Sequence, residues 1–532
     1  MPNWITLAIA LLFLDASLTF ENLWPTPLIS WTGQLSIELA VLVLALLFLR
    51  RFTAGSRERL AGWLSVLWVL LVASHYADVT APALYGRDVN LYWDLQFLPD
   101  VAAMITNSIP AWLLALIAVA VFVVFGILFF VIRKAIGRLR IGMENTGERR
   151  VLAAFAVVVV MAFAAQELFY MPRMAEWDNR RAWLPTPVTW SYVRQARLAI
   201  AGMTPSPLAP SPSMNADLSG LMNRDVYLIF IESYGAIGWE RPDFVRELAP
   251  SRTAFENDIH ATNRRVASAY VESPTFGGNS WLAHISFLSG IEVRDPHTNA
   301  QLMQQKRETL AGVFARAGYR TIALMPGLRR PWPEGRFYGF DDTLTAAEME
   351  YPGPDFGWFA VPDQASLYWL DQRELQRASR KPAFVFFPTL STHVPFSPRP
   401  PYQPDWTRLS TDDKYDGQDI VSAYGEQLDW EDFGPAYAKA VAYTYQTIGG
   451  YLRLRADRDF VMILIGDHQP PAAVSGEGAP WDVPVHVITS DSVLFDQLLT
   501  KGFRPGLSPT RPTLSKMHEL LPILLSAFGE YR

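Results

Sequence analysis

Residues 276–290 read Phe-Gly-Gly-Asn-Ser-Trp-Leu-Ala-His-Ile-Ser-Phe-Leu-Ser-Gly, and this stretch predicts a serine at the start of a helix. Two glycines permit a tight turn into Asn279 and Ser280, and the apolar residues that follow have helical spacing. The first turn of a helix presents free N–H groups and the positive end of the helix dipole, and both favour an anion. Ser280 is therefore a candidate nucleophile. The alternative is a structural serine that caps a buried helix.

The composition of the chain indicates a membrane part joined to a soluble part. Half of the 532 residues are hydrophobic and the mean hydropathy is +0.10. A chain of this length is too long for one domain. The net charge of −6 and the lack of a long basic run argue against a nucleic-acid partner. Cysteine is absent, which excludes disulfides and thiolate metal sites.

Apolar stretches in the first third of the chain predict five transmembrane helices, at residues 4–20, 32–49, 60–77, 111–132 and 151–170. The first stretch lacks a basic leader and a small-residue cleavage site, so we expect it to be retained. Asp15 and Glu38 fall within the first two stretches. A carboxylate inside a membrane is a functional candidate, unless it lies near a helix end or pairs with a neighbour.

Basic residues predict the orientation of the chain in a bacterial cytoplasmic membrane. Arginine and lysine gather in residues 50–59 and 133–150, so both segments are expected to be cytoplasmic. With five spans, the chain after residue 170 then lies outside the cytoplasm. We therefore expect a transmembrane domain at 1–170, a juxtamembrane segment at 171–215 and an extracytoplasmic domain at 216–532.

Aromatic and basic residues alternate from the end of the fifth predicted span into the juxtamembrane segment. The mixture fits the headgroup level of a bilayer, and equally a linker helix packed on the soluble domain. These residues are Phe169, Tyr170, Trp177, Trp183 and Trp190, with Arg173, Arg180, Arg181 and Arg194. Residues 204–213 are rich in proline and serine and predict an extended tether.

The soluble half has short apolar runs separated by helical stretches, which predicts an α/β domain with a mostly parallel, covered sheet. The predicted strands are Val226–Ile231, Thr321–Met325, Phe384–Phe387, Val461–Ile465 and Val483–Ile488. In such a domain the site lies beyond the carboxyl ends of the strands.

Ionisable residues follow three of these strands directly. Glu232 follows the first strand, residues 389–393 with His393 follow the third, and Asp467 and His468 follow the fourth after one glycine. Buried charges at strand ends require a partner or a metal. Two carboxylates and an imidazole suit one divalent cation, with Ser280 as a candidate fourth ligand.

These motifs resemble the alkaline phosphatase/sulfatase superfamily, and most of all the lipoteichoic-acid synthases and membrane-bound phosphoglycerol transferases. The resemblance rests on Ile231-Glu232-Ser233, Ser280 with Gly290, residues 392–396 (Thr-His-Val-Pro-Phe) and residues 465–468 (Ile-Gly-Asp-His). It extends to Trp332 with residues 338–341, which resemble a substrate-pocket segment, and to residues 513–522, which resemble a closing helix. Five spans before an external catalytic domain match the layout of that family.

The resemblance implies a role for each of these residues. Glu232, Ser280, Asp467 and His468 would hold one metal, Mn²⁺ first, with Mg²⁺ and Zn²⁺ also open. Ser280 would be the nucleophile, and His393 would bind the phosphoryl group or assist the leaving group. The residues expected to bind substrate are His393, Trp332, Arg329, Arg330 and His284. The chain departs from the family by carrying Ser280 where threonine is usual, and Glu334 where an arginine is expected.

The implied reaction moves a phospholipid headgroup to an acceptor. Phosphatidylglycerol is the favoured donor, and an envelope glycan or lipid is the expected acceptor. A sulfatase is less well supported, because its signature needs proline two residues after the nucleophile and arginine four residues after it, where this chain has Leu282 and His284. A phosphoethanolamine transferase and a non-catalytic membrane sensor on the same fold are two further interpretations of these motifs.

Overall fold

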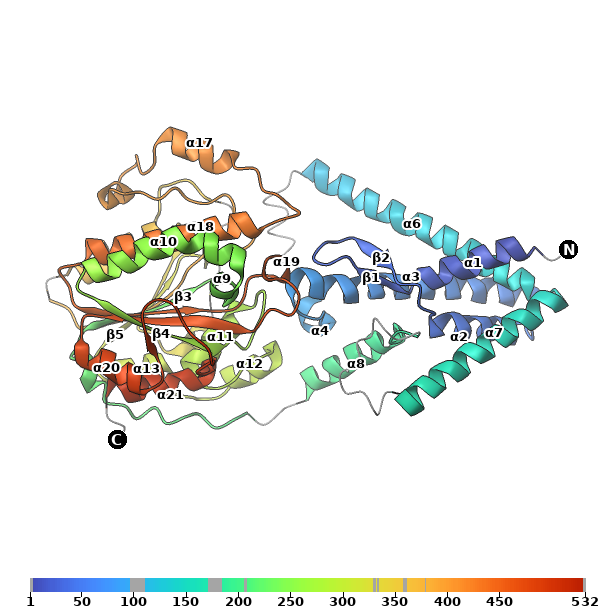
Figure 1. Ribbon diagram of the computed structural model, residues 1–532, viewed down its shortest axis with the longest axis horizontal. Coiled ribbons are helices and arrows are strands. Elements are labelled where there is room, and N and C mark those ends of the chain that lie inside the picture. Colours follow the sequence, from blue (N-terminus) through green and yellow to red (C-terminus); the bar gives the residue numbers. More distant parts are fainter. Residues whose placement is uncertain are drawn as a thin grey trace. The chain divides into compact units, whose positions relative to one another are not determined.

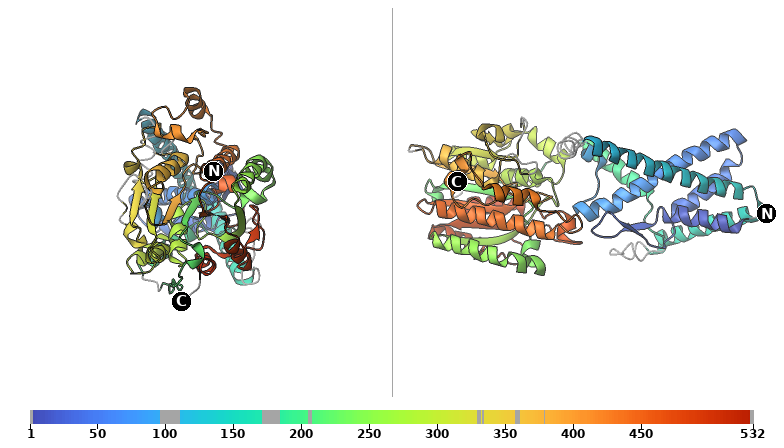
Figure 2. Two further views of the ribbon diagram at one scale, coloured as in Figure 1. Left: turned by 90° about the vertical axis from the view of Figure 1, so that its left-hand side faces the viewer. Right: turned by 90° about the horizontal axis from the view of Figure 1, so that it is seen from above.

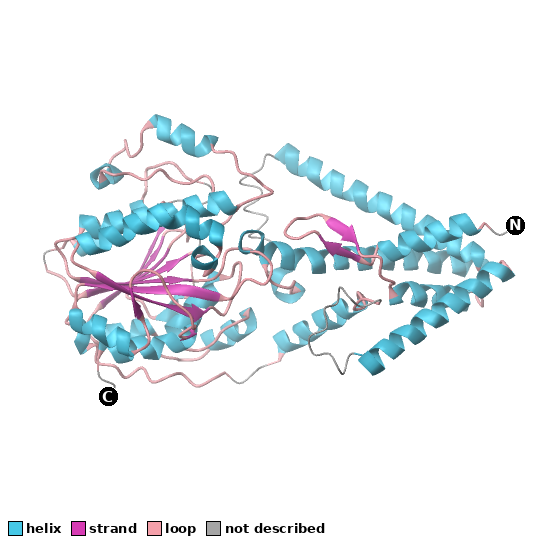
Figure 3. Ribbon diagram, in the orientation of Figure 1, coloured by secondary structure: helices cyan, strands magenta, loops and turns pink. Residues whose placement is uncertain are grey.

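The structure is a computed structural model that describes residues 3–95, 111–170, 184–204, 208–328, 332, 334–356, 361–377 and 379–529. The chain divides into two compact units, which are residues 1–84 with 88–204, and residues 85–87 with 205–532 (Figure 1). The described part of the first unit is helical apart from a short hairpin, and the second unit is built around a sheet (Figure 3).

Three helices of the first unit are long and apolar enough to cross a membrane, namely Gly55–Tyr85, Ala111–Gly142 and Thr146–Leu168. The described α-helices are α1 (Trp4–Ala16), α2 (Ile37–Leu49), α3 (Ala54–Tyr85), α4 (Leu91–Asp94), α6 (Ala111–Gly142), α7 (Thr146–Ala165) and α8 (Thr189–Met203). A short π-helix at Gln166–Tyr170 follows α7. Strands β1 (Phe20–Asn22) and β2 (Ile29–Trp31) form an antiparallel hairpin. Helices α1 and α2 have 13 residues each. Such a helix is about 20 Å long, shorter than a hydrocarbon core of about 30 Å. The count of five spans therefore stays a prediction.

Asp15 and Glu38 are buried and paired, rather than unpartnered within an apolar helix. The Asp15 carboxylate accepts the N–H of Ser36 at 2.8 Å. The Glu38 carboxylate accepts the Ser36 hydroxyl at 2.8 Å and the N–H of Thr189, the first residue of α8, at 3.0 Å. These bonds tie the start of α2 to α1 and the start of α8 to α2.

Much of the predicted aromatic-basic segment lies outside the described residues, since residues 171–183 are not described. Trp190 and Arg194 lie on α8. Within the predicted tether, the described residues 208–213 form no helix or strand.

The second unit contains a nine-stranded mixed sheet in which the neighbours run β10-β4-β9-β8-β3-β7-β5-β6, with β11 paired to β4. Its strands are β3 (Asp225–Ile231), β4 (Arg265–Glu272), β5 (Arg320–Met325), β6 (Asp342–Thr345), β7 (Ala383–Pro388), β8 (Phe460–Gly466), β9 (Asp482–Thr489), β10 (Arg504–Pro505) and β11 (Ser515–Lys516). All five predicted strands are confirmed. The run β8-β3-β7-β5-β6 is parallel, whereas β9 is antiparallel to both β8 and β4.

Helices cover both faces of this sheet, so the strands are buried on both sides (Figure 1). The described α-helices are α9 (Ile237–Glu240), α10 (Pro242–Ala261), α11 (Ser280–Ser289), α12 (Pro296–Met303), α13 (Leu310–Arg316), α14 (Gly335–Tyr338), α15 (Ala346–Met349), α16 (Asp363–Leu370), α17 (Gly417–Gly425), α18 (Gly434–Leu454), α19 (Ala472–Ser475), α20 (Ser492–Thr500) and α21 (Met517–Phe528). Short 3₁₀ helices lie at Ser219–Leu221 and Trp406–Ser410, and a short π-helix lies at Asp371–Leu375. Helix α18 lies alongside α10 over one face, as the view from above shows in orange and green (Figure 2).

Alternate residues of β3 supply two separate cores, because successive side chains of a strand point to opposite faces. Leu228 and Phe230 belong to the core that includes α11, α13 and α21. Tyr227 and Ile229 belong to the core that includes α10, α16 and α18. A strand that is apolar on both faces reads as a continuous hydrophobic run, which is why these strands were predictable.

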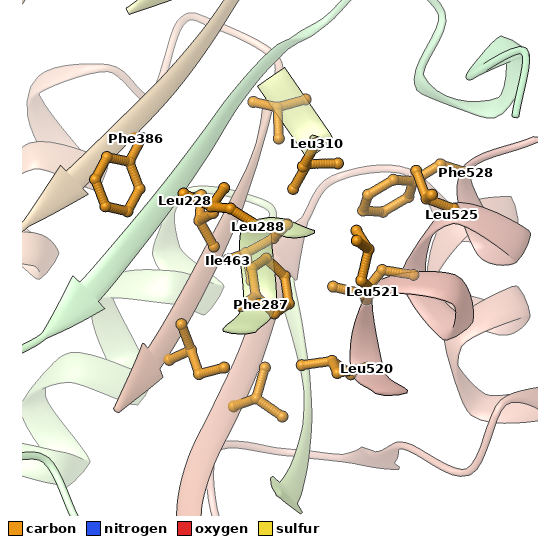
Figure 4. Packing of buried hydrophobic residues seen from close by; sticks show 14 of the residues in the cluster. Leu228, Phe287, Leu288, Leu310, Phe386, Ile463, Leu520, Leu521, Leu525 and Phe528 are labelled. Atoms are coloured by element: carbon orange, nitrogen blue, oxygen red, sulfur yellow. The ribbon is translucent and has the colours of Figure 1, made fainter. Parts of the chain in front are cut away.

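Helix α11 is held in the first core by the last helix of the chain. Phe287 and Leu288 of α11 lie near Leu521 and Leu525 of α21 in the packed interior (Figure 4). Helix α11 ends at Gly290, whose φ of +67° is rarely adopted by other residues. A Cβ there would also lie 2.4 Å from Cγ of Pro212.

The second unit should lose stability in acid partly through His486 of β9. This imidazole is fully buried between the hydroxyls of Ser268, at 2.8 Å, and Tyr234, at 3.1 Å, and burial lowers its pKa to about 3. Between pH 6.5 and 3 the unfolded chain binds a proton at this residue that the folded chain does not, so stability falls as the pH falls. The loss is about 1.4 kcal/mol per pH unit.

We expect His486→Gln to be less stable than wild type near neutral pH but to lose less of its melting temperature as the pH falls from about 6.5 to about 4.5. The measurement is thermal unfolding of the full chain in detergent. The control is His260→Gln, because His260 is exposed on α10. Parallel pH profiles for wild type and His486→Gln would contradict the assignment.

Candidate active site

The candidate site lies at the carboxyl ends of β3, β8 and β7. Because β3 pairs in parallel with both neighbours, Ile231 is opposite Gly466 and Phe230 is opposite Pro388. The residues that follow these strands are thereby brought to one edge of the sheet, as the strand-end pattern predicts. Gly466 permits this close approach, since a Cβ there would lie 1.9 Å from the carbonyl oxygen of Tyr234.

Glu232, Asp467 and His468 form a buried cluster whose ligand atoms all lie within 4.8 Å of one another. Their positions are fixed by the backbone. Asp467 Oδ1 accepts the N–H of Ser233 at 2.8 Å and the N–H of His468 at 2.7 Å. The Nδ1 of His468 lies 2.7 Å from the carbonyl oxygen of Gln469, which leaves Nε2 facing the cluster. One nitrogen and two carboxylate ligands can hold a divalent cation.

The charges of this cluster also fit a cation. Burial and the neighbouring Glu232 carboxylate raise the pKa of Asp467 well above its ordinary value. Burial lowers the pKa of His468, against the opposing effect of the Glu232 carboxylate. Two buried carboxylates this close resist being ionised together, and a bound divalent cation removes that conflict.

Ser280 contacts this cluster directly. Its hydroxyl donates to Glu232 Oε2 at 2.8 Å and lies 3.2 Å from Nε2 of His468. Asn279, with φ at +60°, is the residue that precedes the first turn of α11, and Ser280 is the first helical residue. The alternative of a serine cap is therefore wrong, because the Ser280 hydroxyl bonds to the cluster.

His393 lies in a loop that two neighbouring segments hold in place. The Asp363 carboxylate, at the start of α16, accepts the N–H groups of Leu390 at 2.8 Å and Ser391 at 2.9 Å. Thr392 donates its hydroxyl to the carbonyl oxygen of Glu232. These bonds connect the loop of His393 to the strand end that supplies Glu232. His393 is half-buried.

Asp363 is a residue that sequence reasoning missed. It is almost completely buried, and burial raises its pKa, against hydrogen bonds from Ser391 and Leu390 that lower it. Its only local signal was an acidic residue after Val-Pro, which is ordinary at a helix start. Its partners lie 27 and 28 residues later, so no local pattern joins them.

The other predicted substrate-binding residues are less closely joined to the cluster. His284 lies one turn after Ser280 on α11, with its ring 4.6 Å from that of Phe230 and 5.4 Å from that of Phe386. Burial lowers the pKa of His284 to about 3, so the ring is neutral, and its Nε2 has no hydrogen-bond partner among the described residues.

Trp332 stacks on Tyr338 with the ring centroids 5.2 Å apart. No hydrogen bond or ring contact between described residues joins Trp332 to Ser280 or to the cluster. Arg329 and Arg330 fall outside the described residues.

Comparisons with solved structures found several similar proteins. One is the membrane lipooligosaccharide phosphoethanolamine transferase EptA of Neisseria meningitidis, at 15% identity and a TM-score of 0.47, covering 98% of this chain and 96% of that one. Another is an alkaline phosphatase superfamily protein of Vibrio parahaemolyticus, at 18% identity and a TM-score of 0.39, covering 62% and 73%. A third is the lipoteichoic acid synthase LtaP of Listeria monocytogenes, at 14% identity and a TM-score of 0.36, covering 53% and 68%.

No curated protein matches the chain. Residues 264–487 match the Sulfatase family model, and this range includes Ser280, His393, Asp467 and His468. The second unit of this chain therefore contains a region that matches the Sulfatase family model, as the resemblance of its motifs predicts.

Proposed function

We propose that this protein is a metal-dependent membrane transferase that moves a phospholipid headgroup through a phosphoserine at Ser280. The observation that carries this proposal is the Ser280 hydroxyl, which donates to Glu232 at 2.8 Å beside a cluster able to hold a divalent cation. A hydroxyl at the first residue of a helix, next to a cation site, is suited to attack a phosphate ester.

A divalent cation bound by Glu232, Asp467 and His468 would lower the pKa of the Ser280 hydroxyl and neutralise charge on the phosphoryl oxygens. We propose Mn²⁺ for this site, with Mg²⁺ and Zn²⁺ as the remaining outcomes of metal analysis.

In the first half of the reaction the Ser280 oxygen forms a bond to phosphorus, and the bond from phosphorus to the diacylglycerol oxygen breaks. The Ser280 proton leaves toward Glu232, its hydrogen-bond acceptor. His393 gives a proton to the departing diacylglycerol. In the second half an acceptor hydroxyl forms a bond to phosphorus and gives its proton to His393, while the bond from phosphorus to the Ser280 oxygen breaks and Ser280 takes its proton back from Glu232. Hydrolysis results if water replaces the acceptor.

We propose phosphatidylglycerol as the donor and an envelope glycan or lipid as the acceptor. The long apolar helices of the first unit support a membrane donor, since a tethered site raises the effective concentration of a lipid substrate. We also propose that the chain crosses the membrane five times and that residues 216–532 form an extracytoplasmic domain. Substrate contacts near the headgroup would come from Trp332, Arg329, Arg330 and His284. A phosphoethanolamine transferase uses the same chemistry on another headgroup.

A sulfatase and a non-catalytic sensor are less well supported. The positions that define a sulfatase signature hold Leu282 and His284, which are both buried in α11. A non-catalytic sensor has no need of a serine bonded to an intact ligand cluster, which this chain retains.

Ser280→Ala should reduce turnover on the order of 10⁵-fold without unfolding the protein, because the variant lacks the proposed attacking oxygen. The measurement is the rate of headgroup release by the purified chain in detergent. Ser289→Ala is the control, since Ser289 lies in the same helix but bonds only to the backbone of the helix and its C-terminal turn. If the Ser280→Ala variant releases headgroup at a rate close to wild type, Ser280 is not the nucleophile.

The chain should bind one divalent cation, and Glu232→Gln, Asp467→Asn and His468→Ala should each lose it together with activity. Elemental analysis of the purified protein measures the stoichiometry. Asp363→Asn is the matched control, because it alters a nearby buried carboxylate that accepts hydrogen bonds from the loop of His393 and is not one of the proposed metal ligands. We expect this variant to keep the metal and to lose turnover. Activity that survives full chelation would exclude the metal from the reaction.

Liposomes of phosphatidylglycerol should release diacylglycerol when mixed with the protein and Mn²⁺. The lipids are extracted and separated by chromatography, with Ser280→Ala as the control. Release from phosphatidylethanolamine alone would identify the other headgroup. If no phospholipid yields diacylglycerol while a soluble sulfate or phosphate ester is cleaved, the transferase proposal is wrong.

A further inference from the structure

Helices α3 and α8 of the first unit, with the residues just before α8, line a cavity of about 730 Å³ that opens to the surface and that the proposed reaction does not use. From α8 the lining includes Trp190, Val193, Arg194, Arg197 and Leu198. Their spacing of three to four residues places them on one face of the helix. The α3 wall of the cavity is formed by His75, Asp78 and Val79.

The two arginines of this cavity differ in their partners. Arg194 donates to Asp78 at 2.5 Å and to Asp88 at 2.8 Å, and Asp78 also accepts the hydroxyl of Ser191. The negative charge of Asp78 is therefore already paired with the positive charge of Arg194. Arg197 forms no ion pair or hydrogen bond with any residue in the part of the chain that the structure describes. The cavity thus contains one cationic group that is free to bind an anion.

The remaining lining groups favour an anion that carries an apolar part. Val79, Val193 and Leu198 offer aliphatic surface beside Arg197, and the Trp190 side chain is 50% exposed. A free phosphate would gain nothing from these walls, whereas an acyl glycerol would bury methylene groups there. Helix α8 also exposes apolar side chains further along, at Ile200 and Met203.

The position of the cavity along α3 is that of a lipid headgroup. His75 lies about 27 Å along the helix from Arg57, at about 1.5 Å per residue. A hydrocarbon core is about 30 Å thick. With Arg57 at one headgroup layer, His75 therefore lies near the opposite headgroup layer. Tyr76 and Trp190 are both exposed at this level, as expected for an aromatic belt.

We propose that this cavity binds one anionic phospholipid, with its phosphate on Arg197 and its glycerol and first methylenes on the aliphatic wall. Charge complementarity with Arg197 and the apolar lining together select an amphiphile over a soluble anion. The inference concerns the first unit alone and does not rest on the transfer reaction.

The test uses the full chain in detergent, freed of lipid and carrying Ser280→Ala so that no headgroup is consumed. Native mass spectrometry measures binding of dioctanoyl phosphatidylglycerol. Arg197→Glu should weaken this binding on the order of tenfold or more, as loss of a charge-assisted contact predicts. Arg246→Glu is the matched control, because Arg246 is exposed on α10 of the second unit. Ala201→Trp, which adds an indole to the cavity lining, should also weaken binding.

Circular dichroism and gel filtration establish that each variant is folded. Equal binding by wild type and a folded Arg197→Glu variant would overturn the proposal. The proposal would also be overturned if inorganic phosphate competed for the cavity as well as the lipid does, because the site would then select a soluble anion. Dioctanoylglycerol that binds as tightly as the phospholipid would also overturn it, because the cavity would then have no role for the phosphate. Failure of the diacylglycerol-release assay would leave this result unaffected, since binding is measured without turnover.

Discussion

Two carboxylates, Glu232 and Asp467, are buried side by side at the ends of paired parallel strands, and much of the surrounding structure serves to keep them there. Removing one ionised carboxylate from water costs several kcal/mol, and a second beside it adds repulsion. The chain offsets this with backbone N–H groups on Asp467 and with the Ser280 hydroxyl on Glu232. A bound divalent cation would offset the remaining repulsion between the two carboxylates. The position of Ser280, the proposed nucleophile, thus follows from the same electrostatic demand as the candidate metal site.

Rigid backbone holds the groups that surround these carboxylates. Ser280 begins a helix buried in one core, and the loop of His393 is fastened to the other side of the sheet by Asp363 and Thr392. The groups that would meet around one phosphorus atom in the proposed reaction therefore come from elements that hydrogen bonds and core packing hold in place. Positioning of this kind reduces the entropy that must be lost when the substrate binds.

The sequence predicted the strand ends well because their cause is local. An apolar run that stops shortly before Glu232 or Asp467 indicates both the strand and the end at which the candidate site residues follow. The strand at Arg265–Glu272 was missed, since Ser268 interrupts its apolar run and charged residues stand at both of its ends. The antiparallel direction of β9 was also not predictable, because strand direction depends on how distant segments pair. Asp363 escaped notice for the same reason, as its partners are remote in the chain.

The packing of α11 on α21 makes the order of synthesis matter. The helix that carries Ser280 needs a surface supplied by residues 517–528, and strand β4 is bordered by β9, β10 and β11, which all come later in the chain. A growing polypeptide therefore cannot assemble this part of the second unit until residues 517–528 have been made. Fragments that end before residue 517 would lack the surface on which α11 packs, so Ser280 would not be held beside Glu232 and His468.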